Sequence, residues 1–226
     1  MEKQFYSVAI DGPAGAGKST IARRAAERMR FVYVDTGAIY RTIGYAAFSN
    51  GITQENTAGI AALLPSLRVA LRWENGVQHM DLNDVDVTAH IRRPEISTYA
   101  SVCAAIPEVR AFLLDTQREI AKTHSVVMDG RDIGTVVLPQ ADVKIFLTAS
   151  AEIRAKRRYL ELQEKGAPDT YEAVLADMME RDRRDTGRTI APLKQAPDAI
   201  LIDTTAMNLE ESIDAVVRTI LEKITP

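Results

Sequence analysis

One stretch of eight residues, Gly12–Ser19, constrains this chain more than any other feature. Its sequence, Gly-Pro-Ala-Gly-Ala-Gly-Lys-Ser, matches the phosphate-binding pattern G-x-x-x-x-G-K-[ST]. The apolar run Phe5–Ile10 before it predicts a buried strand, and the residues from Thr20 onward predict a helix. Glycines let backbone N–H groups converge on phosphate oxygens, and a helix N-terminus adds unpaired N–H groups. This order of elements therefore predicts a nucleotide phosphate site rather than a chance glycine-rich turn.

Two side chains of the loop have separate expected roles. Lys18 can reach the outer phosphates of a nucleoside triphosphate, and the Ser19 hydroxyl can ligate Mg²⁺. The residues expected to line the triphosphate are Gly12, Pro13, Ala14, Gly15, Ala16, Gly17, Lys18, Ser19 and Thr20.

Size and charge narrow the class of protein. The 226 residues suffice for one sizeable core with a small inserted lobe, and no apolar run reaches the length of a membrane span. The formal net charge of −3 argues against broad binding to nucleic acid or acidic membranes. A single cysteine, Cys103, excludes an internal disulfide and is expected to be buried. Because the N-terminus does not resemble a signal peptide, we expect a cytoplasmic protein, and we expect a monomer.

Five short apolar runs predict the strands of a buried parallel sheet. Helical patterns separate most of them, which is typical of a doubly wound α/β fold. The runs are Phe5–Ile10, Phe31–Asp35, Ser125–Asp129, Val143–Leu147 and Ala199–Asp203. Asp35, Asp129 and Asp203 end three runs, and Asp11 follows a fourth. Because ligands gather beyond the carboxyl ends of such strands, these carboxylates are functional candidates, although Asp203 is better explained as a turn cap.

Residues 60–107 interrupt this alternation and predict a small inserted lobe. Residues 67–73 alternate as in a strand, Asn75-Gly76 is a two-residue hairpin signal, and Val77–Leu82 is the expected return strand. A short third strand is expected at Val85–Val87.

Helical patterns account for most of the remaining chain. Helices are expected to start at Pro94 and at Pro107, and another is expected over Glu152–Lys165. Capping pairs at Asp169 and Glu172 and at Asn208 and Glu211 predict the starts of two more. We therefore divide a single domain, 1–226, into a core of about 1–59, 108–150 and 190–226, an inserted lobe of about 60–107, and a helical arm of about 151–189.

Arginines are concentrated in this helical arm. Arg154, Arg157 and Arg158 fall on one face of a predicted helix because of their i, i+3, i+4 spacing. A second group after the turn at 165–168 comprises Arg181, Arg183, Arg184 and Arg188. Beside a phosphate loop, such helices are typical of a mobile lid that neutralises phosphate charge and excludes water. The alternative is a solvated surface on which these arginines pair with nearby carboxylates.

Two more arginines follow predicted strands. Arg41 lies in the segment Asp35-Thr-Gly-Ala-Ile-Tyr-Arg, and Arg131 lies in the loop Asp129-Gly-Arg-Asp-Ile-Gly. An acceptor that carries its own phosphate would need such arginines, although ion pairs with neighbouring carboxylates would also explain them. Asp129 is a candidate for holding Mg²⁺ through water.

Together these segments resemble the bacterial cytidylate kinases, a family of nucleoside monophosphate kinases with a phosphate loop. The matching segments are Ile10–Ser19, Asp35–Arg41, Met128–Gly134, Arg154–Arg158 and Arg181–Asp185. The resemblance covers nearly the whole chain, including the enlarged insert of the bacterial form. It implies a five-stranded parallel sheet with flanking helices, an inserted lobe that binds the monophosphate, and an arginine lid. It also implies phosphoryl transfer from ATP, with Mg²⁺, to CMP and dCMP in pyrimidine nucleotide metabolism.

The resemblance also implies roles for individual residues. Ser101, Arg110 and Asp132 would recognise the cytosine edge, because an aspartate accepts from the exocyclic amine while arginine and serine donate to the ring. Thr36 is expected near the base or sugar, and Asp185 near the ribose hydroxyls. The arginines expected on the acceptor phosphate are Arg41, Arg131 and Arg188. The expected catalytic set is Lys18, Arg131, Arg157, Arg158, Arg181 and Arg188.

Three other functions remain open at the level of sequence. A kinase for a different small acceptor would use the same loop and arginines. A regulatory GTPase is disfavoured because the chain has no N-K-x-D sequence. A nucleic-acid binder is disfavoured by the acidic balance. The three histidines have no metal-ligand spacing and are expected to be surface or local structural residues.

Overall fold

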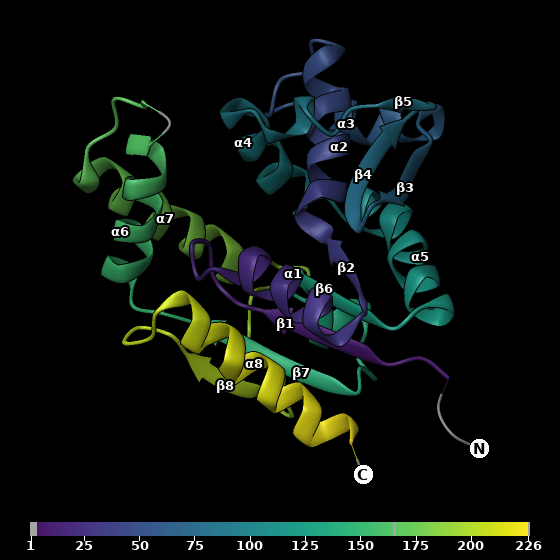
Figure 1. The fold of residues 1–226 in the computed structure, drawn as a ribbon. Coiled ribbons are helices and arrows are strands. Elements are labelled where there is room, and N and C mark those ends of the chain that lie inside the picture. Colours follow the sequence, from purple (N-terminus) through teal and green to yellow (C-terminus); the bar gives the residue numbers. More distant parts are fainter. Residues whose placement is uncertain (1–3, 165, 226) are drawn as a thin grey trace.

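A computed structural model describes residues 4–164 and 166–225 (Figure 1). Within these ranges the central sheet has five parallel strands in the order β2-β6-β1-β7-β8, which confirms the predicted fold class. The strands are β1 (Ser7–Asp11), β2 (Val32–Asp35), β6 (Val126–Gly130), β7 (Val143–Thr148) and β8 (Ile200–Asp203). All five predicted runs are therefore strands, with bounds that differ by at most two residues.

The register of the sheet gathers polar residues at one edge. Ile10 of β1 lies opposite Asp129 of β6, and Asp35 of β2 lies opposite the same Asp129. Because the strands are parallel, their carboxyl ends all lie at the same end of the sheet, which we call the carboxyl edge. The phosphate loop also begins there.

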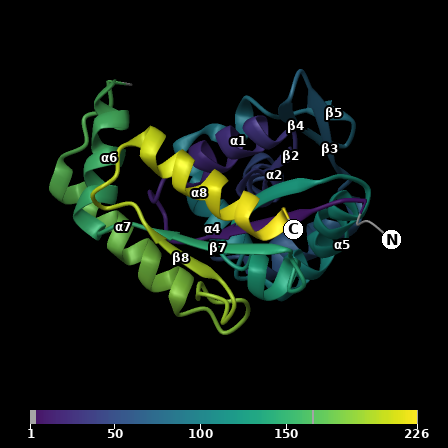
Figure 2. The ribbon, with the colours of Figure 1, turned by 60° about the horizontal axis from the view of Figure 1, so that its bottom comes forward.

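Helices cover both faces of the sheet (Figures 1 and 2). On one face, α1 (Lys18–Met29) and α8 (Leu209–Ile224) pack against the strands through an aliphatic core. On the other face, a second core contains Cys103, as predicted, and is enclosed by α2 (Thr36–Ser49), α4 (Pro94–Cys103) and α5 (Pro107–Thr123). Side chains alternate between the two cores along β1 and β6, which is why these two strands appear as nearly continuous apolar runs.

The inserted segment contains the predicted hairpin. After α3 (Thr57–Leu63), β3 (Val69–Glu74) pairs antiparallel with β4 (Val77–Leu82), and β5 (Val85–Asp86) adds a short third strand. Asn75 and Gly76 have φ angles of 51° and 77°, the left-handed backbone that a tight two-residue turn requires. This small sheet lies beside α2 and the end of β2 (Figure 1).

Two helices, α6 (Ala151–Glu164) and α7 (Tyr171–Thr186), form an antiparallel pair at one end of the main sheet (Figure 2). A small core of their own, which includes Ala155, Val174 and Met178, holds them together. The helix end expected at Lys165 lies outside the described residues.

The predicted cap of α7 was wrong by one residue. Thr170, in extended backbone, accepts from the N–H of Ala173 at 3.3 Å, so the helix begins after Thr170 and not after Asp169. By contrast, the predicted capping box of α8 is confirmed, with Asn208 and Glu211 each accepting from the other's N–H. In the described part of the chain, no helix combines the length and apolar character needed to cross a membrane.

Candidate active site

The phosphate loop follows β1, and its shape depends on glycines. Gly12 has a φ of 151°, and a side chain there would overlap the carbonyl oxygen of Leu147 on β7. Gly15 has a φ of 72° and lies against the side chain of Met178 from α7. Gly17, with a φ of 83°, is the N-cap of α1, whose first turn has no acidic residue. The loop therefore offers backbone N–H groups and the positive end of a helix to an anion.

Lys18, the first residue of α1, is buried and folds back over the loop. Its Nζ donates to the carbonyl oxygen of Pro13 at 2.7 Å. Burial lowers the pKa of Lys18 well below its ordinary value, and the charges of Arg131 and Arg181 lower it further, against the opposite effect of Asp129. A desolvated ammonium beside two guanidinium groups favours the arrival of negative charge.

Asp129 of β6 faces this loop. Ser19 Oγ donates to its Oδ2 at 2.9 Å, and the Tyr33 hydroxyl donates to its Oδ1 at 3.0 Å. Burial, followed by the charge of the neighbouring Asp35, raises the pKa of Asp129 to about 6. Among the described residues, no group of three or more His, Cys, Asp and Glu side chains could hold a metal. A hydroxyl and a carboxylate are oxygen donors of the kind that Mg²⁺ binds together with phosphates and water.

Four arginines from different elements lie close together, and the charge of one of them, Arg131, lowers the pKa of the other three. They are Arg41 of α2, Arg131 of the loop after β6, Arg181 of α7 and Arg188 beyond α7. Burial lowers the pKa of Arg181 to about 10, and burial also lowers the pKa values of Arg41 and Arg188; the charge of Arg131 adds to the lowering in each case. The Nε of Arg181 is buried without a hydrogen-bond partner. This arginine cluster is unfavourable by itself and favours phosphate anions.

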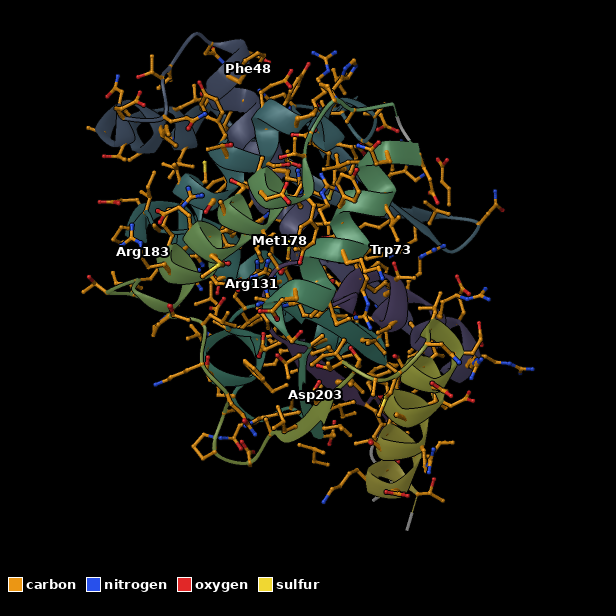
Figure 3. The ribbon with its side chains drawn as sticks, turned by 90° about the vertical axis from the view of Figure 1, so that its left-hand side faces the viewer. Phe48, Trp73, Arg131, Met178, Arg183 and Asp203 are labelled. Carbon is orange, nitrogen blue, oxygen red and sulfur yellow. The ribbon has the colours of Figure 1, made fainter. Side chains whose placement is uncertain are left out.

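Asp185, near the end of α7, orders two members of the arginine cluster. Its Oδ2 accepts from Arg131 Nε at 2.9 Å, and its Oδ1 accepts from Arg188 Nη2. Burial alone would raise the pKa of Asp185, but the charges of Arg131 and Arg188 outweigh burial and lower it. Asp185 therefore stays ionised and fixes the two guanidinium groups beneath α7; Figure 3 shows Arg131 near the centre of the molecule, just below Met178 in that view.

Asp132 and Arg110 form a buried ion pair next to the cluster. Arg110, on α5, donates through Nη2 to Asp132 Oδ2 and through Nη1 to the carbonyl of Ala104 at 3.2 Å. Its guanidinium lies over the ring of Tyr40, 5.7 Å from the centroid. Burial raises the pKa of Asp132, and Arg110 opposes that shift most strongly. Ser101 lies on α4 and is partly exposed.

The start of α2 places two more predicted residues at this edge. Thr36 is buried, and its hydroxyl donates to the carbonyl of Asp129 at 2.7 Å, so its oxygen can only accept from a ligand. Arg41, one turn later, donates to Ser97 Oγ of α4 at 2.6 Å. The helix itself begins here because the Asp35 carboxylate accepts from its first turn.

Asp11 holds the loop that carries Arg131 and Asp132. Its two carboxylate oxygens accept from the backbone N–H groups of Ile133 and Gly134, at 2.8 and 2.7 Å. Burial raises the pKa of Asp11 to about 6, against the lowering effect of these two bonds. The strand-end position marked this carboxylate as a candidate, but its role as an anchor for the neighbouring loop emerges only from the fold.

The three arginines expected on one face of α6 each have different partners. Arg154 is buried, donates to the carbonyl of Ala14 in the phosphate loop at 2.9 Å and pairs with Asp182 of α7 at 2.7 Å. It thereby joins α6, α7 and the loop, a role that the sequence pattern did not indicate.

The other two arginines of α6 point elsewhere. Arg157 donates to the carbonyl of Thr204, beyond β8, at 2.8 Å. Arg158 pairs with Glu161 at 2.8 Å on the exposed surface, yet its charge still contributes to lowering the pKa of Arg41. The structure therefore does not bring Arg157 into the arginine cluster, and it places Arg158 at its margin.

Two further residues at this edge were missed. Arg92, from the inserted segment, pairs with Asp35 Oδ2 at 2.8 Å, and Tyr33 contacts Asp129 as described above. Nothing in the local pattern around Arg92 distinguishes it from a surface arginine. Tyr33 could have been found, because alternation along β2 puts it on the same face as Asp35.

The carboxyl edge of this sheet thus carries a phosphate loop and, facing it, a cluster of partly buried arginines in which the Nε of Arg181 has no hydrogen-bond partner. That arrangement defines the P-loop kinases, in which positioning and charge neutralisation carry out phosphoryl transfer. More particularly, the chain belongs to the cytidylate kinase family, whose model matches residues 8–224.

Individual relatives agree with this assignment. The chain is 46% identical to the cytidylate kinase of Shouchella clausii, with 96% of both chains covered. It is 49% identical to the cytidylate kinase of Thermosipho melanesiensis, with 96% of this chain and 97% of the relative covered. Among solved structures, an uncharacterized protein from Eubacterium ventriosum has a TM-score of 0.52 at 13% identity, covering 94% and 96% of the two chains. The structural likeness shows a shared fold alone.

Proposed function

We propose that this protein transfers the γ-phosphoryl group of ATP to CMP and dCMP, giving ADP and CDP or dCDP. The observation that carries the proposal is the position of the arginine cluster. It lies between a donor side, formed by the phosphate loop, Lys18 and Asp129, and an acceptor side, formed by Arg110 and Asp132. Two nucleotides bound on these sides would meet with their phosphates among the guanidinium groups.

The donor side would bind the phosphates of ATP through the loop residues Gly12–Thr20. Lys18 would exchange the Pro13 carbonyl for a phosphate oxygen, which is a better partner for an ammonium group. Ser19 would ligate Mg²⁺ and Asp129 would hold it through water; the bound ion would supply charge neutralisation on the donor phosphates.

The acceptor side would recognise cytosine through Asp132, Arg110 and Ser101. The Asp132 carboxylate accepts hydrogen bonds, which suits the exocyclic amine of cytosine and disfavours the carbonyl that uracil presents there. Arg110 already fixes this carboxylate. Thr36 would approach the base or the sugar, where its oxygen can accept a hydrogen bond.

The acceptor phosphate would be held by Arg41, Arg131 and Arg188. Because Arg131 and Arg188 are paired with Asp185 before substrate binds, a phosphate that takes up these arginines would release carboxylate oxygens of Asp185 to the ribose hydroxyls. This exchange of one anion for another keeps the guanidinium charges compensated throughout.

The reaction would be a direct in-line transfer. An oxygen of the CMP phosphate attacks the γ-phosphorus, the bond from that phosphorus to the β–γ bridging oxygen breaks, and ADP leaves with that oxygen. The attacking oxygen is ionised at neutral pH, so no strong general base is needed. Lys18, Arg131, Arg181 and Arg188 would stabilise the charge on the transferring group.

The parts of the fold would divide this work. Residues 60–107 would form the acceptor lobe and residues 151–189 the lid, with the remainder as the core. Closure of α6 and α7 would exclude water, which otherwise accepts the phosphoryl group, and would be required to bring Arg157 and Arg158 to the phosphates. We also infer a cytoplasmic monomer that binds neither membranes nor nucleic acid; the net charge of −3 supports the last point.

Acceptor specificity tests this proposal. ADP release would be measured by a coupled assay with ATP, Mg²⁺ and each of CMP, dCMP, UMP and AMP. We expect rapid turnover with CMP and dCMP, at least tenfold weaker activity with UMP and little with AMP. A preference for another acceptor would contradict the proposal and would indicate a kinase that acts on that acceptor instead.

A further inference from the structure

The edge strand β2 brings a tyrosine to the carboxylate expected to hold the metal. Tyr33 lies opposite Val127 in the sheet register, and Asp35 lies opposite Asp129. Side chains two residues apart on a strand share a face, so Tyr33, Asp35 and Asp129 all lie on the same side of the sheet. The diagonal from Tyr33 to Asp129 can be spanned by a long side chain, and here the tyrosine hydroxyl reaches Oδ1 at 3.0 Å.

This hydroxyl is a durable hydrogen-bond donor. A phenol is protonated at neutral pH, so the Tyr33 hydroxyl can donate to the carboxylate. With Ser19 on Oδ2 and Tyr33 on Oδ1, each oxygen of the Asp129 carboxylate has one donor, which fixes the plane of the group.

The neighbouring carboxylate is kept engaged elsewhere. Asp35 Oδ1 accepts from the N–H of Ala38 at 2.9 Å, and Asp35 Oδ2 pairs with Arg92 of the inserted segment at 2.8 Å. Asp129 is therefore the carboxylate at this edge that faces the phosphate loop through Ser19.

The inserted sheet holds the backbone of β2 at the same two residues. Trp73 of β3 donates from Nε1 to the carbonyl of Tyr33 at 3.0 Å. Gln78 of β4 accepts from the N–H of Asp35 at 2.8 Å and donates to its carbonyl at 3.3 Å. These bonds occupy backbone groups that an edge strand would otherwise leave unpaired, and they fix the position from which the Tyr33 side chain extends.

We propose that Tyr33 is a positioning residue that orients the Asp129 carboxylate toward the metal-bound triphosphate, and that the inserted sheet holds Tyr33 in place through Trp73 and Gln78. This inference rests on the proposed function, because it concerns the Mg²⁺ and ATP of the donor side. It gives the inserted segment a part in donor binding in addition to its expected contact with the acceptor.

ATP binding to the intact protein, with Mg²⁺ and with excess chelator, tests the inference by calorimetry without acceptor. The metal effect is the ratio of the Kd for ATP in chelator to the Kd for ATP with Mg²⁺. In Tyr33→Phe this ratio is expected to fall about three- to tenfold, the effect of losing one hydrogen bond to a charged group. ATP binding in chelator is expected to change less than twofold. The spectrum of Mn²⁺ bound with ADP, followed by electron paramagnetic resonance, is expected to change as well.

Two further variants complete the test. Trp73→Phe removes the N–H that donates to the carbonyl of Tyr33. It is expected to reduce the metal effect as Tyr33→Phe does, but by a smaller factor. If Tyr33→Phe does not fold, Trp73→Phe decides the test. Tyr6→Phe, whose ring stacks on Phe31 before the strands begin, is expected to match the unaltered protein.

An unchanged metal effect in Tyr33→Phe, or equal weakening of ATP with and without metal, overturns the inference. The proposed function fails by a different result, absence of CDP formation by the unaltered protein, so the two failures are distinguishable.

Discussion

We propose that donor binding depends on Lys18 more than on any other single residue. Lys18→Met removes the buried ammonium, and we expect kcat to fall by at least about a hundredfold, because charge neutralisation on the transferring group is lost. Stability should not fall with it, since the fold gives up a desolvated charge whose pKa is already lowered. Steady-state kinetics and thermal unfolding measure the two effects. Lys194→Met, at an exposed lysine, is the control, and near-normal turnover of Lys18→Met would refute the assigned role.

Asp132 tests recognition of the acceptor. In Asp132→Asn the amide replaces one acceptor oxygen and loses the charge paired with Arg110. We expect KM for CMP to rise at least about tenfold while KM for ATP changes less than threefold. Asp214→Asn, on the exposed surface of α8, serves as the control. Equal losses for both substrates would remove Asp132 from recognition of the base.

Asp11 makes stability depend on pH in an unusual direction. Its pKa is raised from the ordinary 3.8 to about 6, so the folded state binds this proton more tightly than the unfolded state. The contribution to the free energy of unfolding therefore falls as pH rises from about 4 to about 6, by roughly 2–3 kcal/mol. Asp11→Asn has no titrating group at this position. Urea denaturation between about pH 4 and pH 6 should therefore show the free energy of unfolding of the variant rising relative to that of the unaltered protein. Parallel stability curves would contradict the assignment.

At the scale of secondary-structure elements, the start of α7 offers a direct comparison of two adjacent residues. Thr170→Ala removes the hydroxyl that accepts from Ala173, and we expect a loss of about 1 kcal/mol in the free energy of unfolding. Asp169→Ala, one residue earlier, should cost less than half of that. Urea denaturation of the two variants decides between the caps, and a larger loss in Asp169→Ala would restore the earlier assignment.

The elements themselves were largely predictable, because each depends on a local pattern. The buried strands are apolar on both faces, the Asn75-Gly76 turn needs left-handed backbone, and the Asn208 box is closed by residues three positions apart. The cap at Thr170 was not predictable with the same certainty, since Asp169 and Thr170 are both good capping residues and only the backbone geometry chooses between them.

The candidate site was predictable in composition but not in its contacts. The phosphate loop and the strand-end carboxylates were marked by local sequence. The partners of Arg154 and Arg157 were not, because helical spacing gives the direction of a side chain and not the element that lies in that direction. The link between Tyr33 and Asp129 likewise depends on which strands are neighbours, and β2 and β6 are separated in the sequence by α2, the whole inserted segment and α5.

At the scale of the whole molecule, the inserted lobe and the α6–α7 pair both meet the core at the carboxyl edge of the main sheet (Figure 1). Polar side chains from both parts reach that edge: Arg92 and Gln78 on one side, and Arg154 and Asp185 on the other. Apolar residues of the inserted segment, such as Met80 and Ile91, also pack into the core beside the sheet. The polar contacts can be exchanged for phosphate oxygens while the apolar packing stays in place, which suits the proposed closure over two nucleotides.

Transfer of a labelled phosphoryl group tests the central claim most directly. ATP labelled at the γ-phosphate would be incubated with the protein, Mg²⁺ and CMP, and the products separated. We predict that the label appears in CDP, at its terminal phosphate, in step with the formation of ADP and with little inorganic phosphate. Label that remains in ATP, or that is released as inorganic phosphate while CMP stays unchanged, would contradict the account.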